Sequence, residues 1–260
     1  MGMLLHSNIG KNATFFIFRD NTILVKNDET KSLPTKEIMN LYFEAQSVKE
    51  WFYEPSYNYQ ACFLESDSPT VQHYCWIPLR EFFSLETTFS LIAARAYGLL
   101  LWKQKMRFCS KCGHPLQDDK FETARICTHC NELYFPQISP AIIVLIEKDD
   151  TILLARHKNR ISTIFTCIAG YVEMGETLEE CVQREIKEEV GLSVKNIRYV
   201  GSQSWPFPDQ IMLAFKATYA SGEIVIQPDE LEEARWFKKD TLPPIPKPGS
   251  IAYKLIMNEL

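Results

Sequence analysis

The sequence predicts an α+β protein built from three parts, and three observations carry that prediction. Residues 1 to about 80 alternate short apolar runs with polar breaks, a pattern that is typical of strands. Two cysteine pairs with CxxC spacing follow between residues 109 and 130. From residue 139 onward, strand patterns surround one strongly helical segment. We expect a β-rich domain with a connecting helix over 1–104, a cysteine-rich unit over 105–136 and a domain with a mixed sheet over 137–260.

The N-terminal domain is predicted from three apolar runs, Thr14–Phe18, Thr22–Val25 and Tyr59–Leu64. Its sequence has no glycine-rich loop, metal-ligand spacing or catalytic constellation, so we interpret it as a scaffold or dimerisation domain. A helix is expected from Leu85 to about Met106, with Ser84 as its N-cap. The apolar stripe of that helix consists of Phe89, Ile92, Ala93, Ala96, Leu99 and Leu100.

Composition restricts the possible function classes. The chain has 260 residues, of which 46% are hydrophobic and 23% charged, as in an ordinary globular protein. Its net charge of −5 argues against a surface that tracks a long polyanion, because nonspecific nucleic-acid binding needs an excess of Lys and Arg. No apolar run approaches the ~20 residues of a membrane-spanning helix, and the N-terminus lacks the pattern of a secretory signal. We therefore expect a cytoplasmic protein without membrane contact.

Four of the eight cysteines form two CxxC pairs, Cys109/Cys112 and Cys127/Cys130. Each pair makes a tight turn, or knuckle, with both thiolates on one side, and two knuckles complete a tetrahedral set suited to zinc. Four thiolates leave no open position for water, so we expect a structural zinc ion. The neighbouring His114 and His129 could substitute as ligands, but with four cysteines present we interpret them as exposed.

The other four cysteines are isolated in apolar or helical patterns, and we expect small buried hydrophobes at Cys62, Cys75, Cys167 and Cys181. A zinc ribbon can also be a nucleic-acid module, and several Lys and Arg residues lie near this one. Acidic residues follow at once, at Asp118, Asp119 and Glu122, so the local charge is mixed.

The C-terminal domain is predicted to begin with two strands, Ala141–Ile146 and Thr151–Ala155, joined by a turn at residues 148–150. Further strands reach residues 236–237. A proline-rich stretch then leads to a C-terminal helix that begins at about Ser250. These elements indicate an α/β unit with a mixed sheet.

A helix between those strands has clear start and stop signals. Thr177 and Glu180 form a capping-box pattern, and Gly191 is well placed to end the helix. The apolar residues Val182, Ile186 and Val190 recur every four positions and should anchor the helix to the sheet.

Three carboxylates share another face of this helix, because Glu185, Glu188 and Glu189 stand at i, i+3 and i+4. A solvated acidic face would be the simplest explanation, but it does not account for Glu173 and Glu176 in the preceding loop. A cluster of hard oxygen ligands around Mg²⁺ or Mn²⁺ does. Such ions would bridge phosphate oxygens and help to activate a water molecule.

Residues 170–192 match G-x5-E-x7-R-E-U-x-E-E-x-G-U at every defined position, where U is aliphatic. The segment therefore resembles the Nudix box. The resemblance implies an α/β/α sandwich that cleaves a nucleoside diphosphate linked to another group. It implies that Glu185, Glu188 and Glu189 bind the catalytic metal, with one of the last two helping to activate water. Arg184 would orient a ligand carboxylate through a salt bridge, and Gly170 would let the loop turn close to the substrate.

A second motif narrows the resemblance to the NADH pyrophosphatases, a Nudix subfamily marked by S-Q-P-W-P-F-P-x-S after the box. The matching residues are Ser202, Gln203, Trp205, Pro206, Phe207 and Pro208. The chain departs at Ser204, where the family has proline, and at Gln210, where it has serine. The candidate substrate contacts in this loop are Gln203, Trp205, Phe207 and Gln210. The alternative interpretation of this loop is a hydrophobic plug.

The resemblance also implies roles outside these two motifs. The family carries a four-cysteine ribbon before the Nudix domain, and its bacterial members are homodimers. A base or nicotinamide ring stacks on the aromatic residue after the first glycine of the box, here Tyr171. A second aromatic, here Phe135, can contribute from the partner subunit. Glu230, in the acidic segment before the last strand, matches another metal ligand. Tyr171 and Phe135 could otherwise be ordinary core or interface aromatics.

The expected activity is metal-dependent hydrolysis of the pyrophosphate bond of NAD(H) to nicotinamide mononucleotide and AMP, with NAD-capped RNA 5′ ends as a further substrate. One alternative is another substrate of the same chemistry, such as ADP-ribose or a dinucleoside polyphosphate. The other is a noncatalytic, Nudix-like ligand sensor, against which the presence of all three helix glutamates argues. The choices of NADH or NAD⁺ and of Mg²⁺ or Mn²⁺ stay open.

Overall fold

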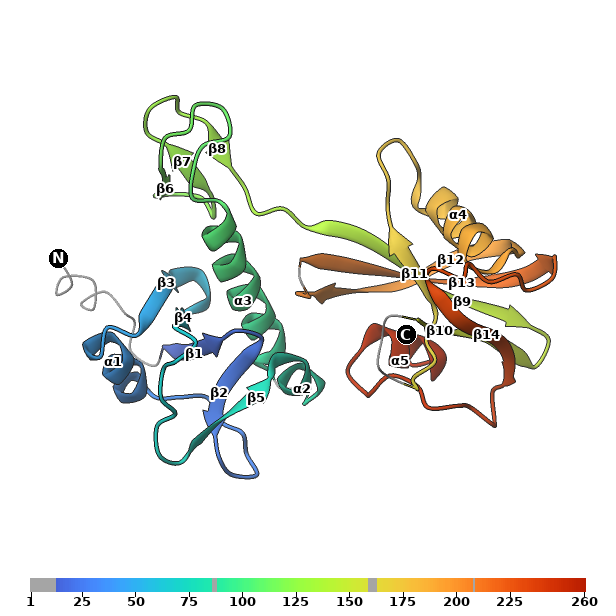
Figure 1. The fold of residues 1–260 in the computed structure, drawn as a ribbon, viewed down its shortest axis with the longest axis horizontal. Coiled ribbons are helices and arrows are strands. Elements are labelled where there is room, and N and C mark those ends of the chain that lie inside the picture. Colours follow the sequence, from blue (N-terminus) through green and yellow to red (C-terminus); the bar gives the residue numbers. More distant parts are fainter. Residues whose placement is uncertain (1–12, 86–87, 159–162, 208) are drawn as a thin grey trace. The chain divides into compact units, whose positions relative to one another are not determined.

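The computed structural model describes residues 13–85, 88–158, 163–207 and 209–260. The chain divides into two compact units, residues 1–137 and 138–260 (Figure 1). This boundary lies one residue from the predicted one, while the division of the first unit near residue 104 stays a prediction. Among the described residues, no helix is both long enough and apolar enough to cross a membrane.

The first unit contains a five-stranded mixed sheet in the order β3-β4-β1-β2-β5. Its strands are β1 Thr14–Arg19, β2 Thr22–Lys26, β3 Val48–Glu54, β4 Tyr59–Leu64 and β5 Tyr74–Pro78. The three predicted strands are therefore confirmed within one or two residues. Strands β1 and β4 run parallel and the other neighbours antiparallel.

Two helices cover the two faces of this sheet. On one face, Met39 and Tyr42 of α1 (Lys36–Glu44) are buried with apolar side chains of β1, β2 and β4. On the other, the Tyr97 ring of α3 (Ser90–Lys105) meets Phe18 and Phe63 edge-on. Helix α1 was not predicted, because its segment carries too short an apolar pattern to stand out from its polar neighbours.

The predicted helix from Leu85 begins later than expected, and the prediction for Ser84 was wrong. Ser84 is the last residue of a separate short helix, α2 (Leu79–Ser84), and its hydroxyl donates to the Glu81 carbonyl. Residues 86–87 lie outside the described residues. Helix α3 follows with Phe89 at its N-cap, and Phe89 is 39% exposed rather than part of the core.

The cysteine-rich segment forms a three-stranded sheet of β6 Leu116–Asp118, β7 Arg125–Cys127 and β8 Leu133–Tyr134. It is fastened to the end of α3 by Arg125, whose Nη1 donates to the carbonyls of Lys103 and Met106 at 2.9 Å each. These are carbonyls that a helix end leaves without intrahelical partners. Lys103, largely buried, also forms an ion pair with Asp118.

The second unit contains a six-stranded mixed sheet in the order β12-β13-β9-β10-β14, with β11 also paired to β9. Its strands are β9 Ser139–Lys148, β10 Thr151–His157, β11 Ile168–Tyr171, β12 Ser193–Trp205, β13 Gln210–Ser221 and β14 Leu231–Lys238. The two helices are α4 Leu178–Val190 and α5 Ile251–Ile256. Strands β9 and β13 are parallel, and the other pairs are antiparallel.

The sheet separates two hydrophobic cores, which gives three layers. On one face, Val182, Ile186 and Val190 of α4 are fully buried against alternate residues of β9, so the predicted anchoring stripe is confirmed. On the other face, α5 packs against the intervening residues of β9 and β13. The α/β/α sandwich with a mixed sheet is therefore present. The Ser250 side chain caps α5 by accepting from the Tyr253 amide, as expected for a helix beginning there.

Candidate active site and metal centre

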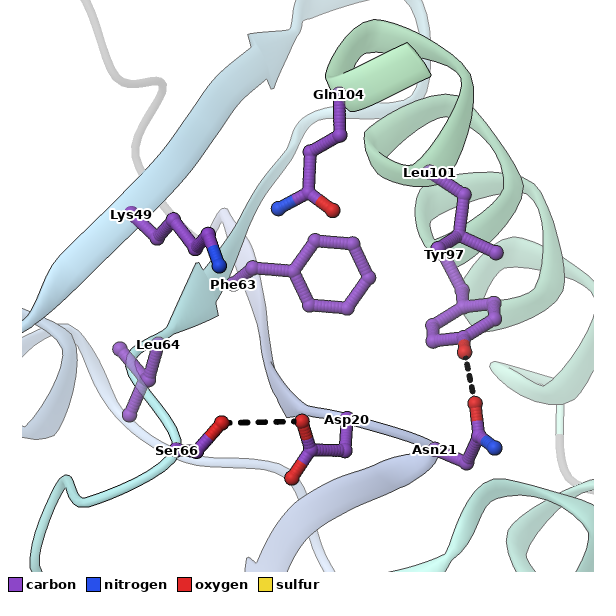
Figure 2. A pocket seen from close by; sticks show the side chains of 9 residues that line it. All are labelled: Asp20, Asn21, Lys49, Phe63, Leu64, Ser66, Tyr97, Leu101 and Gln104. Atoms are coloured by element: carbon purple, nitrogen blue, oxygen red, sulfur yellow. Dashed lines mark hydrogen bonds between the residues drawn. The ribbon is translucent and has the colours of Figure 1, made fainter.

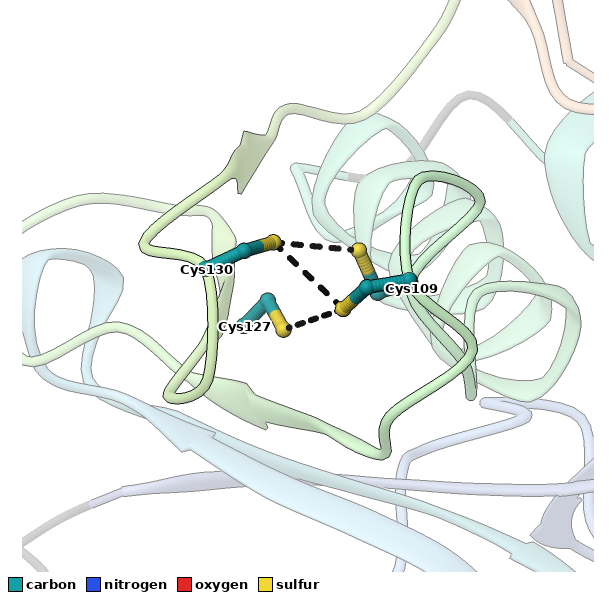
Figure 3. A group of neighbouring side chains, drawn as sticks. Cys109, Cys127 and Cys130 are labelled. Atoms are coloured by element: carbon teal, nitrogen blue, oxygen red, sulfur yellow. Dashed lines mark hydrogen bonds between the residues drawn. The ribbon is translucent and has the colours of Figure 1, made fainter.

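The four cysteines of the two knuckles converge on one point (Figure 3). Their sulfur atoms lie within 4.8 Å of one another, and three of the S···S distances are 3.5 to 3.6 Å. Four sulfurs at about 2.3 Å from a tetrahedral zinc ion would be about 3.8 Å apart. The ribbon therefore fits a structural zinc ion.

The two knuckles repeat one backbone design. The amide of Gly113 donates to the carbonyl of Cys109 at 2.9 Å, and the amide of Asn131 donates to that of Cys127 at 2.8 Å. Gly113 and Asn131 both have positive φ, at 75° and 57°, which asparagine tolerates better than most residues. The turn at Gly113 was predicted from its glycine. Its counterpart at Asn131 was missed, although Asn is the usual substitute.

Tyr134 is a residue of this site that sequence reasoning missed. Its hydroxyl lies 3.2 Å from the Cys109 sulfur and accepts from the Ser110 amide at 3.1 Å. The hydrogen bond from Tyr134 lowers the pKa of Cys109 to about 6, which favours the thiolate that binds zinc. His114 and His129 are exposed, as expected, and their rings stack 3.9 Å apart.

Three of the isolated cysteines, Cys62, Cys167 and Cys181, are fully buried. Cys75 is only partly buried, because it lies on β5 at the edge of its sheet. The prediction of a buried hydrophobe was therefore wrong at Cys75.

In the second unit, the capping box of α4 is present in full. The Glu180 amide donates to the Thr177 hydroxyl at 3.2 Å, and the Thr177 amide donates to the Glu180 carboxylate at 2.7 Å. Gly191 ends the helix with φ of 73°. These two signals fix which residues of α4 face the preceding loop.

Arg184 connects that loop to the helix. Its Nε and Nη2 bind the Glu176 carboxylate at 3.0 and 2.7 Å, and Nη2 also donates to the Tyr171 carbonyl at 2.9 Å. The hydrogen bond from Arg184 lowers the pKa of Glu176 to about 2. On its other side, Nη1 donates to Glu185 at 2.8 Å and to Glu188 at 3.1 Å. A single guanidinium therefore holds three carboxylates.

Gly170 of β11 has a role different from the one expected. A Cβ at this position would lie 1.9 Å from the Glu185 carboxyl carbon. The missing side chain therefore leaves space for the carboxylate of Glu185 against the sheet, and the backbone there is ordinary strand. The expectation that Gly170 serves a loop turn was wrong, because Gly170 lies within the strand.

Glu189 is the most buried of the helix glutamates, at 1% exposed, and its Oε2 has no hydrogen-bond partner among the described residues. Burial, followed by the charges of Glu185, Glu230 and Glu188, raises the pKa of Glu189 to about 8. Burial likewise raises the pKa of Glu185. A buried carboxylate among like charges is costly unless a cation accompanies it. This donor set of hard oxygens fits Mg²⁺ or Mn²⁺.

The carboxylates themselves are less tightly gathered than the thiolates. Within the described ranges, the groups of three or more potential ligand atoms that lie within 4.8 Å of one another are the four cysteines and Cys112 with the two ribbon histidines. The glutamates do not meet this limit, although the same Nη1 atom of Arg184 binds both Glu185 and Glu188. Glu230 is exposed in the segment before β14, and the Gln227 amide ties that segment to the Glu189 carbonyl at 2.9 Å.

Four of the predicted substrate contacts, Tyr171, Gln203, Trp205 and Gln210, share one face of the sheet in the second unit. Tyr171, Ala141, Met212 and Gln203 form one row in register across β11, β9, β13 and β12. The next row on the same face is Ser139, Gln210 and Trp205. Directly paired residues project from the same face of a sheet. The register thus brings together side chains that are distant in the sequence, such as Tyr171 and Gln210, which are 39 positions apart and hydrogen-bonded.

Gln203 is engaged at both ends of its amide. Its Nε2 donates to the Gly249 carbonyl at 2.8 Å and its Oε1 accepts from the Ile251 amide at 2.7 Å, so it fixes the start of α5. Trp205 and Phe207 meet edge-on, with ring centroids 5.1 Å apart. Pro208 of the same motif lies outside the described residues. Phe135 belongs to the first unit and is 55% exposed.

The first unit also has a hollow of about 270 Å³ between β4 and α3 (Figure 2). Polar groups at its rim are bonded to one another: Tyr97 donates to Asn21 at 2.6 Å and Ser66 donates to Asp20 at 3.3 Å. The ring of Phe63 forms part of its floor. Sequence reasoning assigned no site to this region.

Comparison with known proteins agrees with this architecture. Residues 137–258 match the model of the NUDIX domain, and residues 105–135 match that of the NADH pyrophosphatase zinc ribbon domain. The chain belongs to the Nudix family, in the branch that carries this zinc ribbon.

Relatives of known name are closely similar. The chain is 49% identical over 178 residues to the NAD-capped RNA hydrolase NudC of Salmonella typhimurium, covering 68% of this chain and 69% of that protein. It is 52% identical over 165 residues to the protein of the same name from Salmonella heidelberg, a match that spans 64% of either chain. A solved NUDIX hydrolase from Nitrosomonas europaea is 26% identical with a TM-score of 0.47, covering 53% of this chain and 81% of that one.

Proposed function

We propose that this chain hydrolyses the pyrophosphate bond of NAD(H), releasing nicotinamide mononucleotide and AMP. The observation that carries the proposal is a buried carboxylate oxygen of Glu189, among Glu185, Glu188 and Glu230, that has no hydrogen-bond partner in the described part of the chain. A divalent cation would offset that concentration of negative charge, and the same cation would attract the pyrophosphate of a dinucleotide. The names of the relatives support an NAD-type substrate.

Glu185, Glu188, Glu189 and Glu230 would hold Mg²⁺ or Mn²⁺, which when bound neutralises phosphate charge and lowers the pKa of water. The chain's own residues prepare this site. Gly170 leaves the space in which the Glu185 carboxylate lies, and Arg184 fixes that carboxylate from one side. Without a cation, burial raises the pKa of the Glu189 carboxyl to about 8, and a bound divalent cation would favour its ionised form.

The sheet face that carries Tyr171, Trp205 and Gln210 would bind the rings of the substrate. Tyr171 is 50% exposed, so one side of its ring is accessible for stacking. We further propose that the protein is a homodimer in which Phe135 of one subunit contributes to the site of the other. Its exposed ring, 55% accessible in the single chain, supports that role.

A second candidate substrate is RNA with an NAD cap, which contains the same pyrophosphate bond. The name of the Salmonella relatives, NAD-capped RNA hydrolase, favours it. Cap removal would use the same glutamates and would also need a path for the RNA chain. In the ribbon, Lys111 is 65% exposed but is paired with Glu132, so positive charge there is partly neutralised.

Product analysis tests the proposal directly. Purified protein with Mg²⁺ or Mn²⁺ is given NADH, NAD⁺, ADP-ribose and NAD-capped RNA, and the products are separated by chromatography. We expect AMP and nicotinamide mononucleotides from the dinucleotides. Faster cleavage of capped RNA would make cap removal the principal activity. Faster cleavage of ADP-ribose would show that ADP-ribose, rather than NAD(H), is the preferred substrate.

A pair of matched variants connects that activity to the site. Glu189→Gln keeps the size of the side chain but removes its charge, and we expect kcat to fall roughly 100-fold or more. Glu179→Gln makes the same change at an exposed position of α4 and should leave kcat within about twofold. No turnover of any dinucleotide by the unaltered protein would favour the ligand-sensor alternative.

A further inference from the structure

We propose that Gln210 is a positioning residue that fixes the ring of Tyr171 for stacking against a ring of the substrate. The inference rests on the proposed function for the identity of that substrate, a dinucleotide or one of its mononucleotide halves. Its structural basis is a contact between two strands that do not pair with each other, β11 and β13.

The register explains how the two side chains meet. Strand β9 lies between them, with Ala141 opposite Tyr171 and Ser139 opposite Gln210. Both side chains therefore project from the same face and lean across β9, where the small Ala141 and Ser139 leave room. The Nε2 of Gln210 donates to the Tyr171 hydroxyl at 2.5 Å.

This hydrogen bond holds the ring by its edge. The hydroxyl is the end of the tyrosine side chain farthest from the backbone, so a bond there restricts rotation of the ring. The ring remains half-exposed, and no other ring among the described residues is in contact with it. The bond thus removes motion from Tyr171 while leaving its aromatic face to a ligand. Restricting a side chain in its bound orientation reduces the entropy lost on binding.

The hydrogen bond between Gln210 and Tyr171 depends on a residue at which this chain departs from the motif of the resembling family. In the motif that residues 202–210 resemble, serine stands where this chain has Gln210. A serine hydroxyl is two bonds closer to the backbone than the Gln210 amide nitrogen and would not span β9 to the same hydroxyl. Gln210, which departs from the motif, and the hydroxyl of Tyr171 therefore act as a pair, because Gln210 supplies the donor and Tyr171 the acceptor of the hydrogen bond.

A double-mutant cycle tests the coupling. Gln210→Met keeps the length of the side chain without the donor, and Tyr171→Phe keeps the ring without the acceptor. We expect each single variant to raise the KM for NADH about 3- to 10-fold with kcat within about twofold. The double variant should resemble either single variant, because the same bond is removed. Tyr199→Phe, on an exposed tyrosine of β12 outside the site, is the control and should leave KM unchanged.

Calorimetric titration with AMP and nicotinamide mononucleotide gives a second readout that needs no turnover. The dissociation constant of the mononucleotide that stacks on Tyr171 should rise by the same factor in all three variants. Effects that simply add in the double variant, or single variants with unchanged KM and affinity, would overturn the inference. Coupled losses of nucleotide affinity in a protein that cleaves no dinucleotide would support it while overturning the proposed function.

Discussion

The cysteine cluster of the first unit and the glutamate cluster of the second are assembled in different ways. Each cysteine pair is set by a short turn, so two local backbone designs bring four sulfurs within 4.8 Å. The glutamates come from a helix and a distant segment, and Arg184 rather than the backbone holds two of them. The first arrangement suits an ion that stays, and the second suits an ion that must share its coordination with a substrate.

The comparison also predicts opposite effects on stability. Zinc binding by the four thiolates stabilises the fold of the ribbon, so removal of one thiolate should destabilise the first unit. One carboxylate oxygen of the buried Glu189 has no hydrogen-bond partner within the residues that the structure describes, so removing the charge of Glu189 should relieve repulsion. The predictions below test this difference.

The largest expected effect is on the ribbon. Cys109→Ser should abolish stoichiometric zinc binding and unfold the ribbon, because metal affinity supplies much of the folding free energy of such small units. Zinc content and thermal unfolding of the full chain measure it. Cys75→Ser, at a partly buried cysteine outside the cluster, should change stability by about 1 kcal/mol or less. Equal stability of the Cys109 variant without zinc would show that the ribbon does not depend on the ion.

Next in size is the effect of Gly170→Ala on activity. The new Cβ would overlap the Glu185 carboxylate, and that flexible end can move away at little cost to the fold. Because a ligand displaced by about 1 Å can cost 100-fold in rate, we expect kcat/KM to fall by about that factor with Tm nearly unchanged. Gly98→Ala is the control, since a Cβ there meets no heavy atom within 4 Å. Full activity of the Gly170 variant would contradict the role given to this space.

The smallest effect is a pH dependence of stability in protein stripped of divalent ions. Burial raises the pKa of Glu189 from 4.5 to about 8, so between these values the folded state binds more protons than the unfolded state. Stability should therefore fall as pH rises from about 5 to 8. Glu189→Gln should flatten this dependence and raise Tm at pH 8 by roughly 5 °C.

Thermal unfolding in a chelator at several pH values checks this, with Glu179→Gln as the matched exposed control. Added Mg²⁺ should raise the Tm of the unaltered protein more at pH 8 than at pH 5. A Glu189→Gln variant that is less stable than the unaltered protein at pH 8 would contradict the view that this carboxylate is held at a cost.

Features set by local sequence could be predicted most completely. The capping box at Thr177, the end of α4 at Gly191 and the spacing of the two knuckles each depend on a few neighbouring residues. The prediction that a helix starts after Ser84 was wrong, because a single capping residue does not distinguish the end of one helix from the start of the next. Helix α1 was missed because it is a short element in a region where the surrounding sequence patterns are those of strands.

Features set by register could not be predicted in the same way. Nothing in the sequence places Gln210 beside Tyr171, because that contact depends on how β9 pairs with two other strands. The need for glycine at position 170 likewise depends on the close approach of Glu185, which is fifteen positions away in the sequence. The assigned roles of the glutamates, of Phe135 and of the loop aromatics remain predictions that the experiments above address.

Because β9 lies at the centre of the sheet, we expect this domain to tolerate substitutions in β9 better than insertions or deletions there. Alternate residues of β9 face the two cores, and its register decides which face Tyr171 and Gln210 share. Insertion or deletion of one residue within β9 would turn each following side chain to the opposite face. Most substitutions along this strand would cost packing alone, whereas a change of its length by one would separate the ring-binding residues from one another. Variation in length should therefore be found in the connecting loops and be selected against in β9.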